Sequence, residues 1–234
     1  CGVVHPALGS SCFGFTGAVT LVNDAGPEER VVTGLPSIAG ATEALGPSDI
    51  SFTGNQKYVV SIGLGGSPAL RAAYGPQAAW LGTLLTGKLK QAGVSLFADV
   101  LANELASNPD GTDIDTNPVG MVRDGEGYVL ADAGGNAVVR ASHKGTFTTV
   151  TPLPPTAIGA DAVPTSVVQG PDDAYYISQL TGFPFQKGAA NIWRVVPGQP
   201  ATVWASGLTN VTDLAFAPDG SLYAVEIASN GLLT

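Results

Sequence analysis

The sequence predicts an all-β fold, and within that class a β-propeller built from four-stranded blades. Three observations lead to this prediction. The 234 residues include 31 glycines and 17 prolines, roughly a fifth of the chain against a usual share of about an eighth. Apolar residues reach 44% while charged residues are only 12%, a balance typical of a chain that folds rather than one that stays disordered. A hairpin pattern also recurs along most of the chain.

The recurring unit is a short strand, a turn rich in glycine and aspartate, and a second strand that opens on tyrosine. Its four copies are Asp49–Phe52 with Tyr58–Val60, Gly120–Val122 with Tyr128–Leu130, Ser166–Val168 with Tyr176–Ser178, and Asp213–Phe216 with Tyr223–Val225. Their starts lie 71, 46 and 47 residues apart, so the longest interval contains an insertion. Such turns supply the positive φ angles that tight hairpins need. The recurrence places the four tyrosines in the cores of successive blades.

Each full repeat continues into a second pair of strands. Examples are Ala137–Arg140 with Thr146–Val150, and Asn191–Val195 with Ala201–Trp204. Four strands in about 47 residues are typical of a propeller blade. The segments lack the 3.6-residue period of helical repeats, and a sandwich would not repeat its turn chemistry at a fixed interval.

The chain is therefore predicted to form one propeller domain over residues 1–234. Its expected parts are an outer half-blade at 17–35, a blade with an insertion at 47–107, blades at 117–155 and 163–209, and an inner half-blade at 211–234. Within the insertion, Leu81–Leu85 and Val94–Phe97 are expected to be outer strands. Asp99–Ala106 has helical apolar spacing and precedes the stop signal Asn108–Gly111. About four blades' worth of sequence favours a piece of a longer, six-bladed propeller; a closed four-bladed ring is the alternative.

The charge balance excludes some classes of partner. The chain has ten Lys and Arg and 19 Asp and Glu, which give a net charge of −9. The sequence therefore predicts no basic surface for binding nucleic acid or anionic membranes. No apolar run approaches the roughly 20 residues of a membrane span.

Two features bear on the compartment. Cys1 and Cys12 are predicted to form a disulfide that closes a short loop, with two free thiols as the alternative. A disulfide indicates a secreted, extracellular or periplasmic protein. Asn210 opens an Asn-Val-Thr sequon, a glycosylation site if the protein is exported from a eukaryotic cell.

Nucleophilic hydrolysis and histidine-rich zinc sites are disfavoured. His5 and His143 are the only histidines and lie far apart in the sequence, and no Gly-x-Ser-x-Gly elbow is present. A Ser–His hydrolase therefore lacks its base, and a zinc site lacks its ligands.

Carboxylates offer two candidate sites for Ca²⁺ or another divalent cation. Asp113, Asp115 and Asn117 alternate as at the start of a calcium loop, although Pro118 stands where such a loop needs glycine. The alternative is that these side chains cap turns.

The second site follows from blade geometry, since residues flanking the inner strands converge near a propeller axis. Asp49, Asp213 and Glu226 are its expected metal ligands, and Asp132 and Gln179 its expected ligand contacts. The analogy is with six-bladed lactonases, at the level of fold only. The alternative is that Asp132, Gln179 and Glu226 bond neighbouring blades and loops.

An aromatic loop at 181–185 is a further candidate. Thr181, Phe183 and Phe185 could form an apolar surface for a planar ligand or a protein partner. The alternative is that the loop packs over its own blade.

Five segments resemble the ScyD/ScyE family. They are Asn108–Pro118, Ala131–Ala137, Val163–Val167, Leu180–Phe185 and Leu208–Asp213, and the Pro-Asp-Gly-Ser-Leu-Tyr run at 218–223 is generic to NHL-type propellers. The resemblance implies a secreted or periplasmic NHL-like propeller, longer than this chain at both ends, and implies no particular reaction. Two functions follow. The first is a binding or structural module that presents its loops to a protein partner or a small aromatic molecule. The alternative is a metal-dependent enzyme, a lactonase-like hydrolase or a lyase, acting on a small aromatic or lactone-like substrate.

Overall fold

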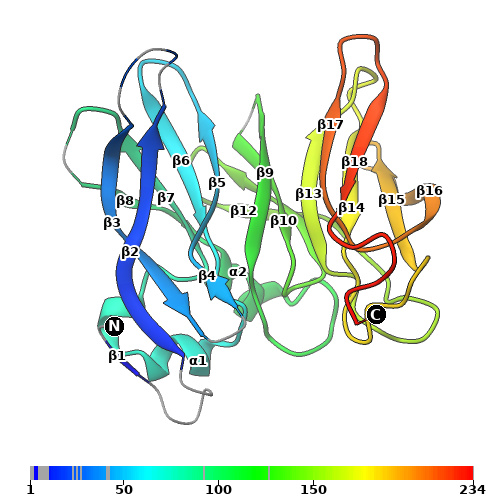
Figure 1. The fold of residues 1–234 in the computed structure, drawn as a ribbon, viewed down its shortest axis with the longest axis horizontal. Helices are drawn as coiled ribbons and strands as arrows, with labels where there is room; N and C mark the ends of the chain where they lie inside the picture. The colour runs from blue at the N-terminus through cyan, green and yellow to red at the C-terminus, as the bar shows by residue number, and fades with distance from the viewer. Residues whose placement is uncertain are drawn as a thin grey trace. The chain divides into compact units, whose positions relative to one another are not determined.

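A computed structural model of the chain describes residues 3–4, 11–22, 24, 26, 28–40, 43–91, 93–125 and 127–233. It consists mainly of antiparallel sheets joined by short turns (Figure 1). By their contacts the residues divide into two units. Unit 1 comprises Cys1–Leu105 with Ile114–Pro118, and unit 2 comprises Ala106–Asp113 with Val119–Thr234. The predicted fold class, an all-β propeller of four-stranded blades, is confirmed.

The first sheet of unit 1 begins earlier than the half-blade expected at 17–35. Its strands, in sheet order, are β1 (Val3–Val4), β2 (Cys12–Leu21), β3 (Glu29–Ala39) and β4 (Ala44–Leu45). Phe13 lies directly opposite Ile38 across the β2–β3 hairpin, and both side chains are buried. This apolar pair lies outside the predicted limits and lengthens both strands.

The second sheet of unit 1 is a four-stranded blade with helical insertions. Its strands are β5 (Pro47–Phe52), β6 (Lys57–Ile62), β7 (Thr83–Lys88) and β8 (Ser95–Asp99). Its helices are α1 (Pro68–Ala73), the single 3₁₀ turn η2 (Pro76–Ala78) and α2 (Val100–Ser107). Asp99 links them, because its Oδ1 accepts bonds from Arg71 Nη1 and from the Ala102 amide in the first turn of α2, both at 3.0 Å. The helix expected at 99–106 is present within one residue.

Unit 2 contains two complete four-stranded sheets and one two-stranded sheet. The strands of the first complete sheet are β9 (Pro118–Asp124), β10 (Gly127–Asp132), β11 (Ala137–Ser142) and β12 (Phe147–Pro152). Those of the second are β13 (Pro164–Gln169), β14 (Tyr175–Gln179), β15 (Ala190–Val195) and β16 (Thr202–Leu208). The third pairs β17 (Val211–Phe216) with β18 (Leu222–Glu226). None of the helices in the described residues is long and apolar enough to cross a membrane.

Neighbouring sheets of unit 2 are tied through their first strands. Ser166 Oγ donates to Asp213 Oδ1 at 2.8 Å, and Thr165 Oγ1 donates to the Val211 carbonyl at 2.9 Å. The backbones also approach closely, since a Cβ on Gly120 of β9 would lie only 2.8 Å from the Thr165 carbonyl oxygen. A glycine at this point lets β9 and β13 pack backbone to backbone.

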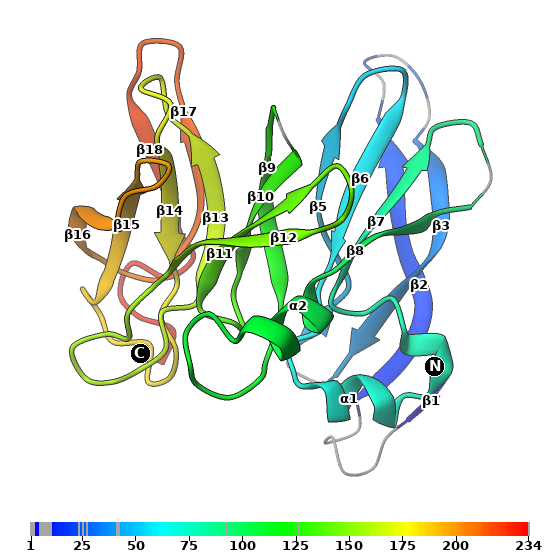
Figure 2. The same ribbon diagram turned by 180° about the vertical axis from the view of Figure 1, so that it is seen from behind.

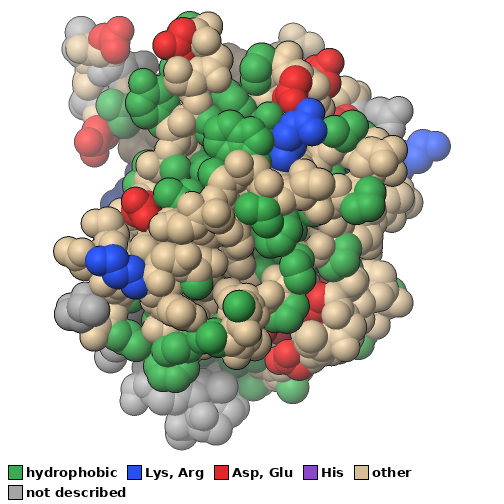
Figure 3. Space-filling view, turned by 90° about the vertical axis from the view of Figure 1, so that its right-hand side faces the viewer, with side chains coloured by type: hydrophobic (Ala, Val, Ile, Leu, Met, Phe, Trp, Pro, Cys, Tyr) green, Lys and Arg blue, Asp and Glu red, His purple; other side chains and the backbone are tan. Residues whose placement is uncertain are grey.

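The four repeat tyrosines each occupy the second position of the second strand, but only three are in the core. Tyr58, Tyr128 and Tyr176 are buried, whereas Tyr223 is 63% exposed. The prediction that Tyr223 is a core residue is wrong, because β17 and β18 pair only with each other among the described strands and Tyr223 stays exposed on this sheet. Figure 3, which looks onto the side where β15–β18 lie in Figure 1, shows apolar side chains across the middle of that face.

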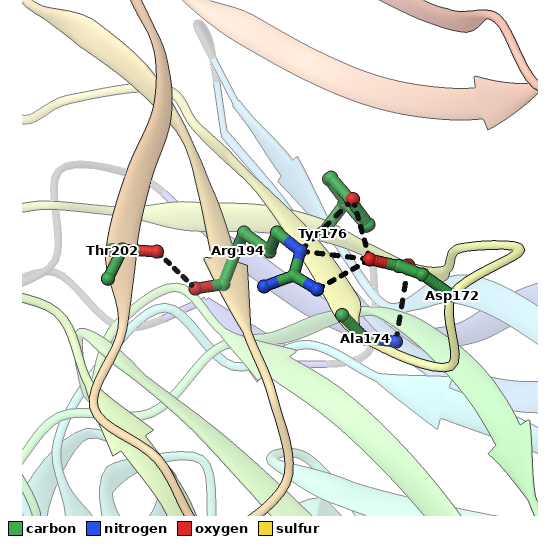
Figure 4. A network of polar contacts seen from close by, with 5 residues as sticks. All are labelled: Asp172, Ala174, Tyr176, Arg194 and Thr202. Carbon is green, nitrogen blue, oxygen red and sulfur yellow. Dashed lines mark hydrogen bonds and ion pairs between the residues drawn. The ribbon is translucent and has the colours of Figure 1, made fainter.

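Each complete sheet of unit 2 carries one Asp–Arg pair at its hairpins. Arg140 Nη2 and the Tyr175 hydroxyl both donate to Asp124 Oδ2. In the next sheet, Asp172 Oδ2 accepts from Arg194 Nη2 at 2.6 Å, from Arg194 Nε at 3.0 Å and from the Tyr176 hydroxyl at 3.2 Å (Figure 4). Hydrogen bonds from the Arg194 guanidinium hold the pKa of Asp172 below its usual value of 3.8.

This lowered pKa predicts an acid-sensitive contribution to stability. Because the folded-state pKa of Asp172 is depressed, the contribution is present above pH 3.8 and is lost as pH falls through the lower folded-state value. We expect Asp172→Asn and Arg194→Gln each to flatten the pH dependence of the free energy of unfolding below pH 4, relative to the unmodified chain. Urea unfolding at a series of acidic pH values measures this slope. A variant that retained the full slope would show that the pair does not couple protonation to folding.

Candidate functional site

In unit 2 the connections between second and third strands, and those that lead from one sheet to the next, gather at one end of the sheets. They include residues 132–137, 152–164, 180–190 and 208–211 (Figure 2). Backbone bonds tie two of them together: the amides of Leu180, Thr181 and Gly182 donate to the carbonyls of Val163, Ala162 and Asp161. Side chains from several loops therefore meet at this end.

Asn136 holds three of these segments in place. Its backbone carbonyl accepts from Leu153 N at 2.8 Å, its Oδ1 accepts from Val163 N at 3.0 Å, and its Nδ2 donates to Asp110 Oδ2 at 3.0 Å. Asn136 is buried and has a φ of +45°, a conformation that asparagine adopts more readily than most residues. The β10–β11 loop thus fixes both the 108–113 loop and the 152–164 loop.

Asp110 is fixed by neighbouring donors. Its Oδ2 accepts from the Thr112 hydroxyl at 2.7 Å as well as from Asn136, and its Oδ1 accepts from Thr112 N at 3.0 Å. With these partners the carboxylate presents a preorganised negative charge rather than a mobile one.

The 108–113, 132–137 and 152–164 segments enclose a cavity of about 390 Å³, which we call the Asp110–Asp161 cavity. It is lined by Asp110, Thr112, Asn136, Pro152, Leu153, Pro154, Pro155, Gly159, Asp161 and Ala162. The prolines, Leu153 and Ala162 give it an apolar wall, and the two carboxylates are its charged groups. No Lys, Arg or His of the described residues lines it, so the cavity favours a neutral or positively charged ligand with an apolar part.

Asp161 is the more accessible of the two carboxylates and connects the cavity to the aromatic loop. A Cβ on Gly182 would lie 3.5 Å from Asp161 Oδ2, so the carboxylate lies against the backbone just before Phe183. Phe183 is 75% exposed, and its ring meets that of Phe185 edge to face at 6.2 Å. The predicted 181–185 loop therefore adjoins the cavity, with Phe183 exposed, whereas Thr181 is buried.

Two predicted ligand contacts are engaged inside the protein. Asp132 is buried, and its Oδ1 accepts from Gly135 N at 3.3 Å. Gln179 is also buried, and its Oε1 accepts from Asn191 N, Asn191 Nδ2 and Trp193 Nε1, each at 3.1 Å. Gln179 thereby joins β14 to β15 within one blade.

Further predicted residues of unit 2 lie at the same end. Asp213 bonds Ser166 of the neighbouring sheet, and Glu226 Oε1 accepts from Thr209 N at 2.6 Å. Asn210 is fully buried, and its Nδ2 donates to the Leu180 carbonyl at 2.9 Å. A glycan needs an exposed asparagine amide, so this geometry argues against the predicted glycosylation and gives Asn210 a structural role.

Metal ligation receives no support from the described residues. Among them, no three His, Cys, Asp or Glu side chains lie close enough together to hold a metal ion. Asp49 Oδ1 accepts from Ile50 N at 2.7 Å, Asp113 is exposed, and Asn117 Oδ1 would lie 2.5 Å from a Cβ on Gly63. Asp115 and Asn117 are half-buried. The predicted cation sites, including the one with Asp213 and Glu226, therefore rest on sequence alone.

Some predicted features lie partly outside the described residues. Cys12 opens β2, but Cys1 and His5 lie outside the described residues. The disulfide stays a prediction. His143 is exposed, with its Nε2 3.3 Å from the Gly125 carbonyl oxygen.

Asp110, Asn136 and Asp161 were not predicted as site residues. A signal was present, because Asp110 and Asn136 lie in segments that carry the ScyD/ScyE resemblance. No local pattern marks Asp161, which becomes a cavity residue only through the pairing of 161–163 with 180–182.

Comparisons with known proteins bear on the fold. No protein-family model and no curated protein matches the sequence. Among solved structures, a virginiamycin B lyase from Staphylococcus aureus matches with a TM-score of 0.53 and 14% identity over 92% of this chain and 63% of its own. A catalytically inactive variant of that lyase with quinupristin gives a TM-score of 0.53, 13% identity and coverage of 93% and 64%. A gluconolactonase from Xanthomonas campestris gives a TM-score of 0.53, 17% identity and coverage of 85% and 60%.

At these identities the likeness shows the β-propeller fold alone. The chain spans 60–64% of the length of these structures.

Proposed function

We propose that this protein is a β-propeller enzyme of the lyase or lactonase kind, and that its small organic substrate is recognised in the Asp110–Asp161 cavity. The cavity is the observation that carries the proposal. Its volume of about 390 Å³ falls within the range of about 300–1,000 Å³ typical of small-molecule sites. Its position at the end where the inter-strand loops meet, and the fold shared with a lyase and a gluconolactonase, support an enzyme over a purely structural module.

The lining suggests the substrate class and the roles of two residues. An apolar wall beside exposed Phe183 suits a small aromatic or lactone-like molecule. Asp110 is held by three hydrogen bonds from Thr112 and Asn136 and is suited to orient a substrate donor. Among the described residues no side chain donates a hydrogen bond to the exposed carboxylate of Asp161, which is therefore suited to accept a proton from the substrate.

The proposal assigns no step to a metal ion, because the described residues do not gather a ligand set for one. Dependence on Ca²⁺ or another divalent cation stays a prediction from sequence. Membership of the ScyD/ScyE family and export from the cytosol are part of the proposal, supported by the resemblance and by the pair Cys1 and Cys12. A peptide map of unreduced protein would test the disulfide.

We expect purified protein to turn over a member of a panel that includes gluconolactone, aromatic lactones and virginiamycin B. Asp161→Asn should lower kcat by about 100-fold or more if the carboxylate accepts a proton in the reaction, and Phe183→Ala should raise KM. Asp173→Asn makes the same charge change on an exposed hairpin at the other end of the sheets and should change neither. Equal activity of Asp161→Asn and Asp173→Asn would contradict the proposal, and assays with a chelator test metal dependence.

A binding module is the second candidate, favoured by the exposed Phe183–Phe185 pair. In that case panel members or a protein partner would bind without turnover, and Phe183→Ala would weaken binding while Asp161→Asn would not. Binding measured by calorimetry alongside turnover distinguishes the two functions.

A further inference from the structure

One end of the β5–β8 sheet, in unit 1, is basic. The hairpin segments 50–60 and 84–98 contain Lys57, Lys88 and Lys90 but neither Asp nor Glu. In a chain with ten cations and a net charge of −9, three lysines without an acidic residue in the same segments form an unusual concentration of positive charge.

The strand register brings two of these lysines together. Lys57 of β6 is the direct partner of Lys88 of β7, and Thr86 is the direct partner of Ser95 of β8. Direct partners in an antiparallel pair share a face, and so do alternate residues of one strand. Lys57, Lys88, Thr86 and Ser95 therefore lie on the same face of the sheet.

Like charges that lie directly opposite each other destabilise a sheet. Among the residues that the structure describes, no carboxylate forms an ion pair with either lysine, and the fold keeps this repulsive pair in place. A bound anion would remove the repulsion.

A cavity of about 410 Å³ lies over this face. It is lined by Lys57, Thr86, Gly87, Lys88, Gln91, Gly93, Val94 and Ser95. The ammonium groups, the Ser95 hydroxyl and the Gln91 amide are donors, and no Asp or Glu of the described part of the chain lines the cavity. The Thr86 hydroxyl donates a hydrogen bond to the Tyr58 carbonyl at 2.8 Å. The loop that follows β7 is held by a hydrogen bond from Leu89 N to the Gln56 carbonyl at 2.9 Å.

We propose that this cavity, the Lys57–Lys88 cavity, binds the phosphate or sulfate group of a small molecule or glycan. Such a group carries negative charge and several acceptor oxygens, which match two ammonium groups with neutral donors beside them. The site is separate from the Asp110–Asp161 cavity, which has carboxylates and favours ligands without negative charge. The inference does not depend on the proposed function.

Titration of the full chain with inorganic phosphate, followed by amide chemical shifts, tests the site. We expect saturable shifts at Gly87, Gln91 and Gly93 that chloride at the same ionic strength does not produce. Lys57→Gln and Lys88→Gln should each weaken phosphate binding roughly tenfold, as expected for loss of a charged hydrogen bond. Lys144→Gln, an equal charge change on the exposed β11–β12 hairpin, should leave binding unchanged.

Thermal unfolding provides a second readout. Phosphate should raise the Tm of the unmodified chain, whereas Lys57→Gln should unfold at an equal or higher Tm without phosphate and gain less from the same phosphate concentration. Titrations with glucose 6-phosphate and with a sulfated disaccharide distinguish a phosphorylated small molecule from a sulfated glycan as the ligand. The compound that binds more tightly than inorganic phosphate identifies the ligand class. Phosphate shifts no larger than those of chloride, or equal weakening by Lys144→Gln, would overturn the proposal.

Discussion

Gly127→Ala is expected to destabilise unit 2 by about 3 kcal/mol, the upper end of the usual cost of overpacking. Gly127 opens β10 and pairs with Ser142 of β11. A Cβ there would lie 2.0 Å from the Ala141 carbonyl oxygen and 2.9 Å from Ser142 Cα. Both atoms belong to backbone, so neither can rotate away, and the added methyl group must push the two central strands of the blade apart.

Gly125→Ala is the matched control, since it adds the same methyl group to the same hairpin. A Cβ on Gly125 would meet no atom within 4 Å, and we expect its effect to stay within about 0.5 kcal/mol. Equilibrium urea unfolding of both variants measures the difference. Equal midpoints for the two variants would show that the β10–β11 pair tolerates a side chain at this position.

Gln179→Leu is expected to cost unit 2 about 3 kcal/mol by leaving buried donors without an acceptor. The substitution keeps a similar volume but removes the oxygen that accepts from Asn191 N, Asn191 Nδ2 and Trp193 Nε1. Trp193 is buried, so water does not replace the lost bond freely. We also expect faster hydrogen exchange at the Trp193 indole.

Two variants test whether the lost acceptor is the cause. Gln186→Leu makes the same change in an exposed loop and should alter the free energy of unfolding by less than about 0.5 kcal/mol. The double variant Gln179→Leu with Trp193→Phe should lose less free energy of unfolding than the sum of the two single variants. Trp193→Phe removes the indole N–H, so this donor can no longer be left without an acceptor by Gln179→Leu. Additive losses would mean that packing, not hydrogen bonding, sets the role of Gln179.

Local patterns were sufficient to predict the blades. The hairpin turns near Asp124, Asp172 and Asp219 and the tyrosine that follows each of them mark the inner strands, because turn chemistry and strand alternation act over a few residues. The α2 helix was predicted for the same reason, since its apolar spacing and the stop at Asn108 are local. Tyr223 shows the limit, because its burial depends on whether further strands cover β18 and not on its own hairpin.

The candidate site could be predicted only in part. The Thr181–Phe185 loop was found because an apolar, aromatic run directly follows the second strand of a predicted blade. The cavity beside it depends on hydrogen bonds that join residues far apart in sequence, such as Asn136 with Asp110 and Val163. The Lys57–Lys88 pair likewise requires the register of β6 and β7. Composition and local patterns do not predict contacts between residues so far apart in the sequence.

The two-stranded β17–β18 sheet has a consequence for how the chain behaves when concentrated. Within the described residues, no strand pairs with β18 on the side away from β17, and Tyr223, Val225 and Ile227 are each at least 57% exposed beside that open edge. Unprotected apolar edges of this kind act as templates for intermolecular sheets and hence for aggregation. We therefore expect the isolated polypeptide to associate through this edge at high concentration, despite its net charge of −9.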